Sequence, residues 1–278
     1  IYGAMVGFLF APNVHFGNFY FTPELALLAG NVFVYFVSPK GRFTLTLIEK
    51  KEIADGAYEF IFTPDHPLTF KAGQYVEWTL GHHFSDDRGN RRYFTVTSSP
   101  TESVVRLGVK FYKPASTFKR ALWAMQKGDT LSVSHPAGDF VLPRNKNEKL
   151  AFIAGGIGIT PFKSMVQYLV DTKDSRAVTL LYSNKTASEI AYKDAFDAAS
   201  QTIGMKTVYA LTNEPTPVPG TYSGFIDAAL IAREIPDYRE RTFYLSGPHG
   251  MVEAFKKTLH SMGVSDFSIK ADYFPGFA

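Results

Sequence analysis

The sequence predicts an α/β plus all-β protein, with a small antiparallel β-barrel followed by a doubly wound parallel sheet and preceded by an apolar helical segment. Three observations lead to this prediction. Short runs of alternating polarity follow residue 42, apolar runs alternate with helical stretches after residue 150, and residues 1–39 contain no lysine or arginine. We place the parts at residues 1–40, 41–145 and 146–278.

Composition limits the possible functions. The chain has 278 residues, 45% hydrophobic and 20% charged, which is typical of a globular protein. A formal net charge of +3 does not favour nucleic acid as a partner. The absence of cysteine excludes disulfides, thiolate nucleophiles and cysteine-ligated zinc or iron–sulfur clusters from this chain. Any one-electron centre must therefore lie elsewhere.

An apolar helix is expected over residues 23–37. Thr22 can cap it, and Pro23 fits the first helical position. Its length of roughly 22 Å is less than the roughly 30 Å of a bilayer core. It is either a short, tilted or interfacial membrane segment or a helix packed on protein. Basic residues from Lys40 onward would place the rest on the cytoplasmic side of a membrane, and without a span the chain is a soluble cytoplasmic module.

Residues 15–39, HFGNFYFTPELALLAGNVFVYFVSP, resemble the end of the membrane subunit of Rnf-type and sodium-pumping quinone reductase complexes. The resemblance covers about 25 residues. It implies a membrane domain upstream of Ile1.

The barrel is predicted from the alternating runs at residues 43–48, 58–62 and 75–80, which clusters of turn-forming residues separate. Several short strands at such spacing are typical of a small antiparallel barrel.

A cation, two aromatic residues and a hydroxyl follow one another in Arg92-Tyr93-Phe94-Thr95. On a strand, Arg92 and Phe94 share one side, while Tyr93 and Thr95 share the other. Taken alone, this run also fits an ordinary exposed strand.

The run resembles the Arg-x-Tyr/Phe-Ser/Thr signature of the ferredoxin–NADP reductase superfamily, in which a six-stranded antiparallel barrel binds FAD. The resemblance implies that Arg92 holds the flavin pyrophosphate, that Phe94 lies beside the isoalloxazine and that the Thr95 hydroxyl bonds its N5 atom. Tyr93 and the following residues Thr97 and Ser98 are also assigned to the cofactor.

The superfamily continues with a glycine- and serine-containing turn that opens a helix under the pyrophosphate. Here Ser116 and Thr117 can donate hydrogen bonds, but Pro114 and Ala115 stand near the place of the usual glycine. Lys110, at the end of the preceding strand, is included among the cofactor-binding residues.

A second anion site is predicted after the apolar strand 150–154. The turn that follows contains Gly155, Gly156 and Gly158 and runs through Thr160 and Pro161 into a helix over 162–170. Glycines allow close approach to a pyrophosphate, and a helix start favours negative charge. Glycine turns occur in many α/β proteins, but Gly-Gly-x-Gly-x-Thr-Pro resembles the ferredoxin-reductase variant.

The alternation predicts further strands at 177–182, 206–211 and 242–245 and helices at 190–200 and 226–233. Ser183 and Lys185 follow the first of these strands, where the superfamily contacts the 2′-phosphate or ribose. No arginine or carboxylate selects between NADPH and NADH there, so the choice stays open. A solvated loop lysine is an equally good interpretation of Lys185.

The run Ser246-Gly247-Pro248-x-x-Met251 resembles the superfamily's Cys-Gly-Pro-x-x-Met at the nicotinamide. Ser246 replaces the usual cysteine, which keeps size and hydrogen bonding but loses the polarizable sulfur. Phe277 is the candidate aromatic shield of the flavin ring and Phe274 the alternative. A plain buried aromatic is an equally good interpretation of either.

Together these motifs predict an NAD(P)H-dependent flavoprotein reductase. NADH or NADPH gives hydride to FAD, and electrons pass to a separate iron–sulfur, haem, flavin or quinone acceptor. Thr95, Ser246 and Phe277 are the residues assigned to the reacting centre. The adjacent His82 and His83 lack a carboxylate at ligand spacing, so no metal site is expected. The alternatives are a non-catalytic FAD-binding docking scaffold and a ferric-reductase or oxidase-like module of a membrane haem protein.

Overall fold

The computed structural model describes residues 15–16, 19–20, 23–37, 41–82 and 85–274. Contacts divide the chain into two units, Ile1–Gly41 and Arg42–Ala278. The expected cap Thr22, His83 and the candidate shield Phe277 lie outside the described residues.

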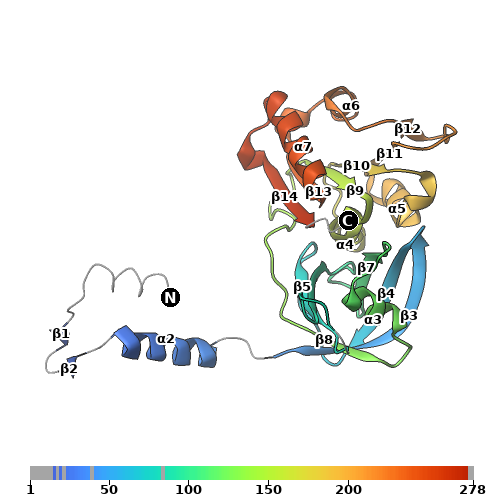
Figure 1. The fold of residues 1–278 in the computed structure, drawn as a ribbon. Helices are drawn as coiled ribbons and strands as arrows, with labels where there is room; N and C mark the ends of the chain where they lie inside the picture. The colour runs from blue at the N-terminus through green and yellow to red at the C-terminus, as the bar shows by residue number, and fades with distance from the viewer. Residues whose placement is uncertain (1–14, 17–18, 21–22, 38–40, 83–84, 275–278) are drawn as a thin grey trace. The chain divides into compact units, whose positions relative to one another are not determined.

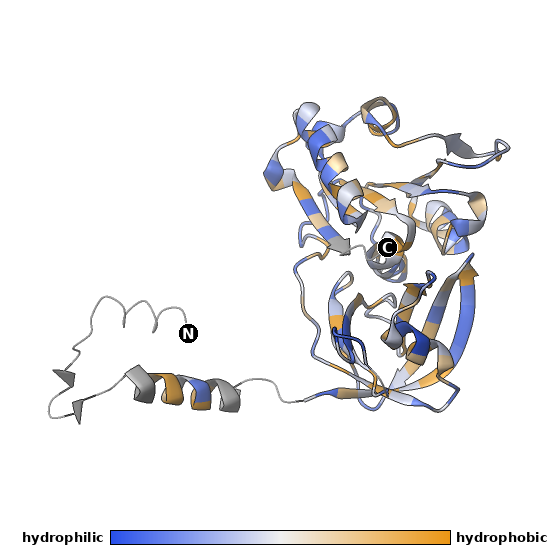
Figure 2. Ribbon diagram, in the orientation of Figure 1, coloured by the Kyte–Doolittle hydropathy of each residue, from blue (hydrophilic) through white to orange (hydrophobic). Residues whose placement is uncertain are grey.

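The first unit contains a two-stranded antiparallel ladder, β1 His15–Phe16 with β2 Phe19–Tyr20, and the helix α2 Pro23–Val37. This helix occupies the residues for which one was expected. Leu27, Leu28, Val32 and Phe33 are exposed on it, and Figure 2 colours its described part mainly as hydrophobic. None of the helices among the described residues, α2 included, combines the length and the apolar character needed to cross a bilayer.

The second unit begins with a six-stranded antiparallel sheet in the order β6-β5-β8-β3-β4-β7 (Figure 1). Its elements are β3 Phe43–Ala54, β4 Ala57–Pro64, β5 Tyr75–Thr79, β6 Arg91–Thr95, β7 Val105–Lys110, α3 Thr117–Ala124 and β8 Thr130–Val133. Alternate residues point inward, so Leu45, Phe60 and Trp78 are fully buried in one core. Phe118 of α3 packs into the same core.

The parallel sheet follows, in the order β12-β11-β10-β9-β13-β14. Its strands are β9 Leu150–Gly155, β10 Val178–Asn184, β11 Lys206–Leu211, β12 Thr221–Ser223, β13 Thr242–Pro248 and β14 Ile269–Phe274. The α-helices between them are α4 Thr160–Asp171, α5 Lys193–Ile203, α6 Ala228–Glu234 and α7 His249–Ser261. The single-turn 3₁₀ helices are η1 Gly156–Ile159, η2 Ala187–Glu189, η3 Tyr238–Glu240 and η4 Asp266–Ser268.

Helices cover both faces of this sheet. Phe162 of α4 and Phe196 of α5 belong to one core, while Leu230 of α6 and Val252 of α7 belong to another. The order reverses beside β9, because β10 pairs on one side and β13 on the other. In such sheets ligands bind beyond the carboxyl ends of the strands at this point.

Candidate functional site

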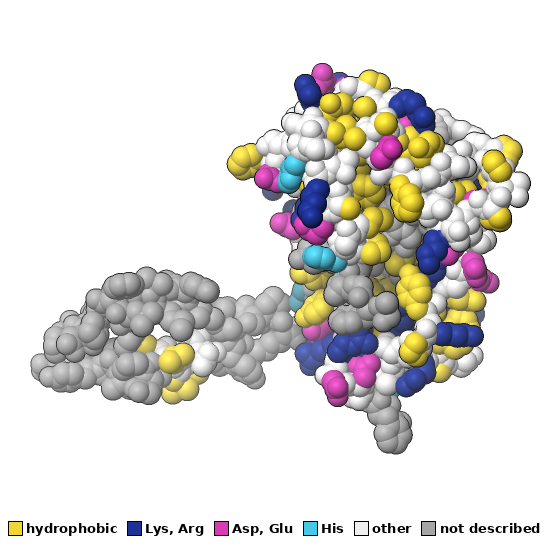
Figure 3. All heavy atoms as spheres, turned by 45° about the horizontal axis from the view of Figure 1, so that its top comes forward, with side chains coloured by type: hydrophobic (Ala, Val, Ile, Leu, Met, Phe, Trp, Pro, Cys, Tyr) yellow, Lys and Arg dark blue, Asp and Glu magenta, His cyan; other side chains and the backbone are white. Residues whose placement is uncertain are grey.

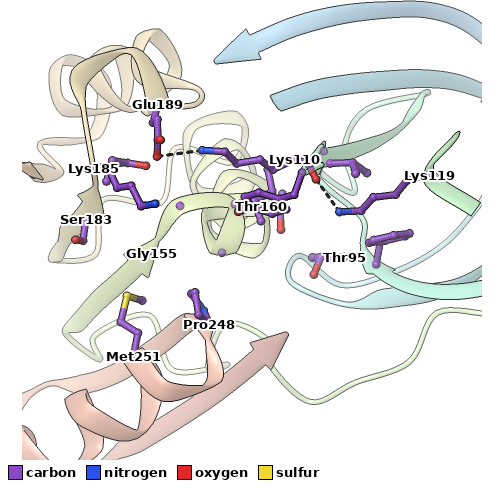
Figure 4. A pocket seen from close by; sticks show the side chains of 18 of the residues that line it. Thr95, Lys110, Lys119, Gly155, Thr160, Ser183, Lys185, Glu189, Pro248 and Met251 are labelled. Atoms are coloured by element: carbon purple, nitrogen blue, oxygen red, sulfur yellow. Dashed lines mark hydrogen bonds and ion pairs between the residues drawn. The ribbon is translucent and has the colours of Figure 1, made fainter. Parts of the chain in front are cut away.

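A cavity of about 1350 Å³ lies where the two sheets of the second unit meet. The barrel contributes β6, β7 and the start of α3, and the parallel sheet contributes the ends of β9, β10 and β13 (Figure 4). Fourteen of the residues assigned from the sequence line it: Arg92, Tyr93, Phe94, Thr95, Lys110, Ser116, Gly155, Gly156, Gly158, Thr160, Ser183, Lys185, Pro248 and Met251.

Six other assigned residues are not among those that line it: Thr97, Ser98, Thr117, Pro161, Ser246 and Gly247. Three of them accept hydrogen bonds from backbone amides and so support the structure around the cavity. Thr97 Oγ1 accepts a hydrogen bond from the Gly108 amide at 3.0 Å, and Ser98 Oγ accepts one from the Arg106 amide at 3.2 Å. Thr117 Oγ1 accepts one from the Asp86 amide at 3.0 Å.

The Arg92 guanidinium is held within the protein. It donates to the carbonyl oxygens of Arg88, Gly89 and Arg91 at 2.6–2.9 Å, and to the Asp86 carboxylate at 2.8 Å. Partial burial acts to raise the pKa of Asp86, but the hydrogen bonds from Arg92 and Thr117 outweigh it and lower that pKa to about 2. Asp86 therefore neutralises Arg92 at physiological pH.

The other residues of β6 differ in exposure. Tyr93 is 63% exposed and donates its hydroxyl hydrogen bond to Glu77 at 2.9 Å. Phe94 is half-buried, with its ring 6.0 Å from that of Phe118. Thr95, at the end of the strand, is only 3% exposed but lines the cavity.

Two lysines meet at the corner between β7 and α3. The Lys110 ammonium lies 3.0 Å from the Glu189 carboxylate of η2, so an ion pair joins the barrel to the parallel sheet (Figure 4). Lys119 donates to the Lys110 carbonyl oxygen at 2.7 Å, and burial lowers the pKa of Lys119. The half-exposed ring of Tyr112 lies 5.9 Å and 5.4 Å from the two ammonium groups. Ser116 caps α3 by accepting from the Lys119 amide.

The glycine turn requires its glycines for different reasons. Gly156 has φ of +52°, a conformation that side chains disfavour. A Cβ on Gly158 would lie 2.5 Å from the Ser246 carbonyl oxygen, and one on Gly155 would lie 2.3 Å from the Met251 sulfur. The turn therefore packs directly against the end of β13 and leaves its backbone open to the cavity.

The end of β10 presents three consecutive polar residues. Ser183 and Lys185 line the cavity, as does Asn184 between them. Asn184 is 5% exposed, and its side-chain amide has no hydrogen-bond partner among the described residues. An unpaired buried amide is costly, which favours a ligand or solvent contact at this position.

Ser246 of β13 is fully buried, and its hydroxyl has no partner among the residues that the structure describes. It is the register partner of Asp272 on β14, whose pKa is raised by burial and by Asp139. The side chain of Phe274, the alternative shield, is not described. Gly247 packs against Met251, because a Cβ there would lie 2.4 Å from the methionine methyl.

Sequence reasoning missed several lining residues: Tyr112, Lys119, Asn184, Glu189, Thr212 and Phe225. Asn184 could have been found because it stands between two assigned residues at a strand end. Phe225 could not, because nothing in the sequence shows that a ring 74% exposed lies at a cavity.

The chemistry of the cavity fits two dinucleotide pyrophosphates. Of the described lining residues, six are lysines or arginines (Arg88, Arg91, Arg92, Lys110, Lys119, Lys185) and one, Glu189, is a carboxylate. The start of α3 and the turn before α4 both face the cavity, and neither helix has an acidic residue in its first turn. No cluster of three or more potential metal ligands occurs within the described ranges. On the face drawn in Figure 3, basic side chains are interspersed with carboxylates.

Comparison with known proteins agrees with this chemistry. The model of the oxidoreductase NAD-binding domain matches residues 152–257. A flavohemoprotein from Oceanobacillus iheyensis is 27% identical over 235 residues, which is 81% of this chain and 56% of that protein. NADH-cytochrome b5 reductase 2 of Mycosarcoma maydis is 30% identical over 191 residues, which is 66% of this chain and 54% of that protein. The chain thus spans little more than half of these two relatives.

Solved structures give the same result. The Amycolatopsis cytochrome P450 reductase GcoB has a TM-score of 0.74 at 25% identity, covering 84% of this chain and 70% of its own. The cytochrome b5 reductase domain of Ulva prolifera nitrate reductase has a TM-score of 0.72 at 25% identity, covering 86% and 99%. The six-stranded barrel, the parallel sheet and the family match confirm the predicted fold: this chain carries a ferredoxin–NADP reductase-like FAD/NAD-binding oxidoreductase module.

Proposed function

We propose that this module takes hydride from NADH or NADPH into FAD and passes the electrons to a separate acceptor. The observation that carries the proposal is that one cavity joins the aromatic–hydroxyl strand β6 to the glycine turn after β9. A flavin on the first and a nicotinamide on the second would face each other there. We place the boundary between the two parts near residue 145, just before β9 begins at Leu150.

The barrel side would hold FAD. Thr95 and Phe94 would lie at the isoalloxazine, Arg92 and the start of α3 at Ser116 would meet the pyrophosphate, and Tyr112 offers a half-exposed ring for stacking. Tyr93 lies at the rim of this half of the cavity. Thr97, Ser98 and Thr117 act indirectly, because their hydroxyls support β7 and the loop that carries Asp86.

The sheet side would hold the nicotinamide nucleotide. The backbone of Gly155, Gly156 and Gly158 lines the cavity at the start of α4 and would meet its pyrophosphate, beside Thr160. Pro161 occupies the first turn of α4. Ser183 and Lys185 would meet the adenosine half. Pro248 and Met251 would contact the nicotinamide. Ser246, whose hydroxyl has no partner among the described residues, precedes them on β13.

FAD supplies the chemistry, since it accepts a hydride and releases single electrons. The protein orients the two cofactors and neutralises their phosphates. Because no acid or base is needed for hydride transfer itself, the rate depends on the separation and alignment of the reacting rings.

The acceptor is proposed from the relatives. A flavohemoprotein, cytochrome b5 reductases and a P450 reductase are all proteins whose names concern haem partners. We propose a haem or another one-electron centre on a separate domain or chain as the acceptor here. The ferric-reductase or oxidase-like alternative differs only in the identity of this acceptor centre.

Anaerobic stopped-flow measurement of the FAD-loaded protein with NADH and with NADPH tests the proposal. We expect rapid bleaching of the flavin absorbance with at least one nucleotide. A flavin that binds but is reduced by neither would contradict the proposal and favour the docking scaffold. The ratio of the two rates identifies the preferred nucleotide.

Membrane contact through residues 1–40 is a separate proposal. It is supported by the exposed apolar side chains of α2, among them Leu28 and Phe33. Vesicle flotation of the full chain and of the chain from Arg42 onward tests it. Equal flotation of the two would contradict it.

A further inference from the structure

Tyr192, the N-cap residue directly before α5, has two unfavourable features. Its φ is +59°, in the left-handed region that residues other than glycine seldom adopt. Its hydroxyl is buried beside the Glu59 carboxylate and the Thr97 hydroxyl, but it makes no hydrogen bond of good geometry with any described residue. Strain and an unpaired polar group both cost stability, so another constraint must hold this side chain in place.

The Tyr192 hydroxyl lies where the two sheets of the second unit approach each other. A Cβ built on Gly108 of β7 would be 2.6 Å from this hydroxyl oxygen and 2.9 Å from Cγ2 of Thr160. Gly108 lines the cavity from the barrel, and Thr160 lines it from the start of α4. The tyrosine therefore fills the space between β7, which lines the barrel side of the cavity, and the turn proposed to carry the nicotinamide nucleotide.

The surroundings of Tyr192 keep its hydroxyl neutral. Burial, and then the nearby Glu59 carboxylate, raise the pKa of Tyr192 well above its ordinary value. Glu59 is the register partner of Gly108, is 2% exposed and accepts a hydrogen bond from Arg106 at 3.0 Å. Lys163 of α4 lies 5.9 Å from the tyrosine ring. The hydroxyl remains protonated throughout the working pH range.

Other contacts already hold the two parts together. The Ser164 hydroxyl donates to the Ser98 carbonyl oxygen at 2.6 Å, and the Asp55 amide donates to the Ser188 carbonyl oxygen at 2.9 Å. Because these bonds do not involve Tyr192, its hydroxyl is not needed to hold the barrel and the parallel-sheet part together. The hydroxyl instead adds a close van der Waals contact with Gly108, beside the cavity.

We propose that Tyr192 is a positioning residue that sets the separation of β7 and the start of α4, and thereby the distance between flavin and nicotinamide. The proposal rests on the proposed reductase function. Hydride transfer is steep in distance, and a displacement of about 1 Å can reduce the rate by about a hundredfold.

Four variants test it: Gly108→Ala, Tyr192→Phe, the double variant, and Thr95→Ala as a positive control for the flavin site. Gly108→Ala forces a methyl group against the hydroxyl and should slow flavin reduction by about tenfold or more. Tyr192→Phe removes the oxygen and should slow it by about threefold, since the contact loosens without collapsing. In the double variant the methyl group takes the space of the lost oxygen, so the rate should recover toward that of Tyr192→Phe.

Each protein is measured for FAD content, thermal unfolding, the reduction rate with nucleotide deuterated at C4, and the charge-transfer absorbance formed with oxidised nucleotide. Gly81→Ala and Tyr238→Phe are matched controls, because a Cβ on Gly81 meets no atom within 4 Å and Tyr238 lies outside the cavity. We expect the charge-transfer absorbance to follow the reduction rate while FAD content stays constant.

The double variant decides the question. If it is as slow as Gly108→Ala, the added methyl group acts through Thr160, the flavin or the barrel rather than through the Tyr192 hydroxyl, and the proposal is wrong. If Tyr192→Phe reduces flavin at the wild-type rate with unchanged charge-transfer absorbance, the proposal is also wrong. Failure of the wild-type flavin to accept hydride from either nucleotide would instead overturn the proposed function, whatever the variants do.

Discussion

Replacing the three turn glycines by alanine, one at a time, should separate packing from backbone strain and from ligand contact. Gly158→Ala is the most informative change. Its Cβ would meet the Ser246 carbonyl oxygen at 2.5 Å and the Gly247 Cα at 2.6 Å, and both are backbone atoms of β13. Neither can move without moving the strand.

The size of the effect follows from two opposing contributions. Overpacking a close contact costs about 1–3 kcal/mol, and rigid backbone neighbours place this site near the upper end. A glycine-to-alanine change without a left-handed φ returns about 0.4–1 kcal/mol by reducing the entropy of the unfolded chain. The net loss for Gly158→Ala is therefore about 2 kcal/mol, or roughly 4–8 °C in melting temperature for a unit of this size.

The other two glycines should behave differently. A Cβ on Gly156 meets nothing within 4 Å, so its alanine variant should lose about 1 kcal/mol through its left-handed φ alone. A Cβ on Gly155 meets the flexible end of Met251, whose methyl group can rotate away. Gly155→Ala should therefore melt near the wild-type temperature but raise KM for the nucleotide, since Met251 is displaced.

Chemical and thermal unfolding of the FAD-saturated proteins, followed by steady-state kinetics with NADH and NADPH, measure both effects. If Gly158→Ala melts at the wild-type temperature, the close approach of the turn to β13 is not what requires glycine. If Gly155→Ala is as unstable as Gly158→Ala, the distinction between a flexible and a rigid neighbour is refuted.

Three further changes test the charges and hydrogen bonds of the site. Lys110 lines the cavity next to Glu189 of the parallel sheet, so we expect its ammonium to attract the phosphates of the nucleotide once Glu189→Gln removes their ion pair, which is worth about 0.2–1 kcal/mol. KM for the nucleotide should then fall by about two- to fivefold, and an unchanged KM would show that Lys110 does not reach the nucleotide. Asp86→Asn should destabilise the protein at pH 7, because the folded pKa of Asp86 is lowered to about 2. Its contribution is fully present above the unfolded pKa of about 4 and is lost as pH falls through about 2, so the difference from wild type should shrink over that range. A difference independent of pH in unfolding titrations would contradict the pairing with Arg92. Tyr182→Phe should lower the free energy of unfolding by about 1–3 kcal/mol, because the buried Tyr182 hydroxyl donates a hydrogen bond to a carbonyl oxygen of the glycine turn at 3.0 Å. Equal stability of the variant and the wild type in denaturant unfolding would refute that role.

The sequence predicted the regular elements with strong periodicity and missed those without it. The apolar run 150–154 lies within β9, and the helix expected over 162–170 lies within α4. The helix expected over 190–200 instead starts at Lys193, because Tyr192 breaks the helical conformation with its left-handed φ. The short strand β12 had no predictable pattern, since three residues cannot show one.

The site was predictable where a residue's role depends on its neighbours in sequence. The glycine turn needs only a strand before it and a helix after it, and both are encoded locally. The hydroxyls of Thr97 and Ser98 accept hydrogen bonds from amides of β7, a strand that begins at Val105. A long-range hydrogen bond of this kind leaves no signal in a single sequence.

Arg92 shows how the two kinds of information combine. The sequence motif predicts that Arg92 binds the flavin pyrophosphate. In the structure its guanidinium already binds another anion, the Asp86 carboxylate, and three carbonyl oxygens. A pyrophosphate approaching Arg92 must therefore share the guanidinium with Asp86 or displace its carboxylate. The loop that carries Asp86 is held to α3 by the hydrogen bond from the Asp86 amide to the Thr117 hydroxyl. Since the carboxylate preorganises the guanidinium but also competes for it, removal of Asp86 should loosen the arginine and strengthen its attraction for phosphate at the same time. The net affinity for FAD then reports which of these contributions is larger, and weaker binding in Asp86→Asn would identify preorganisation as the dominant one.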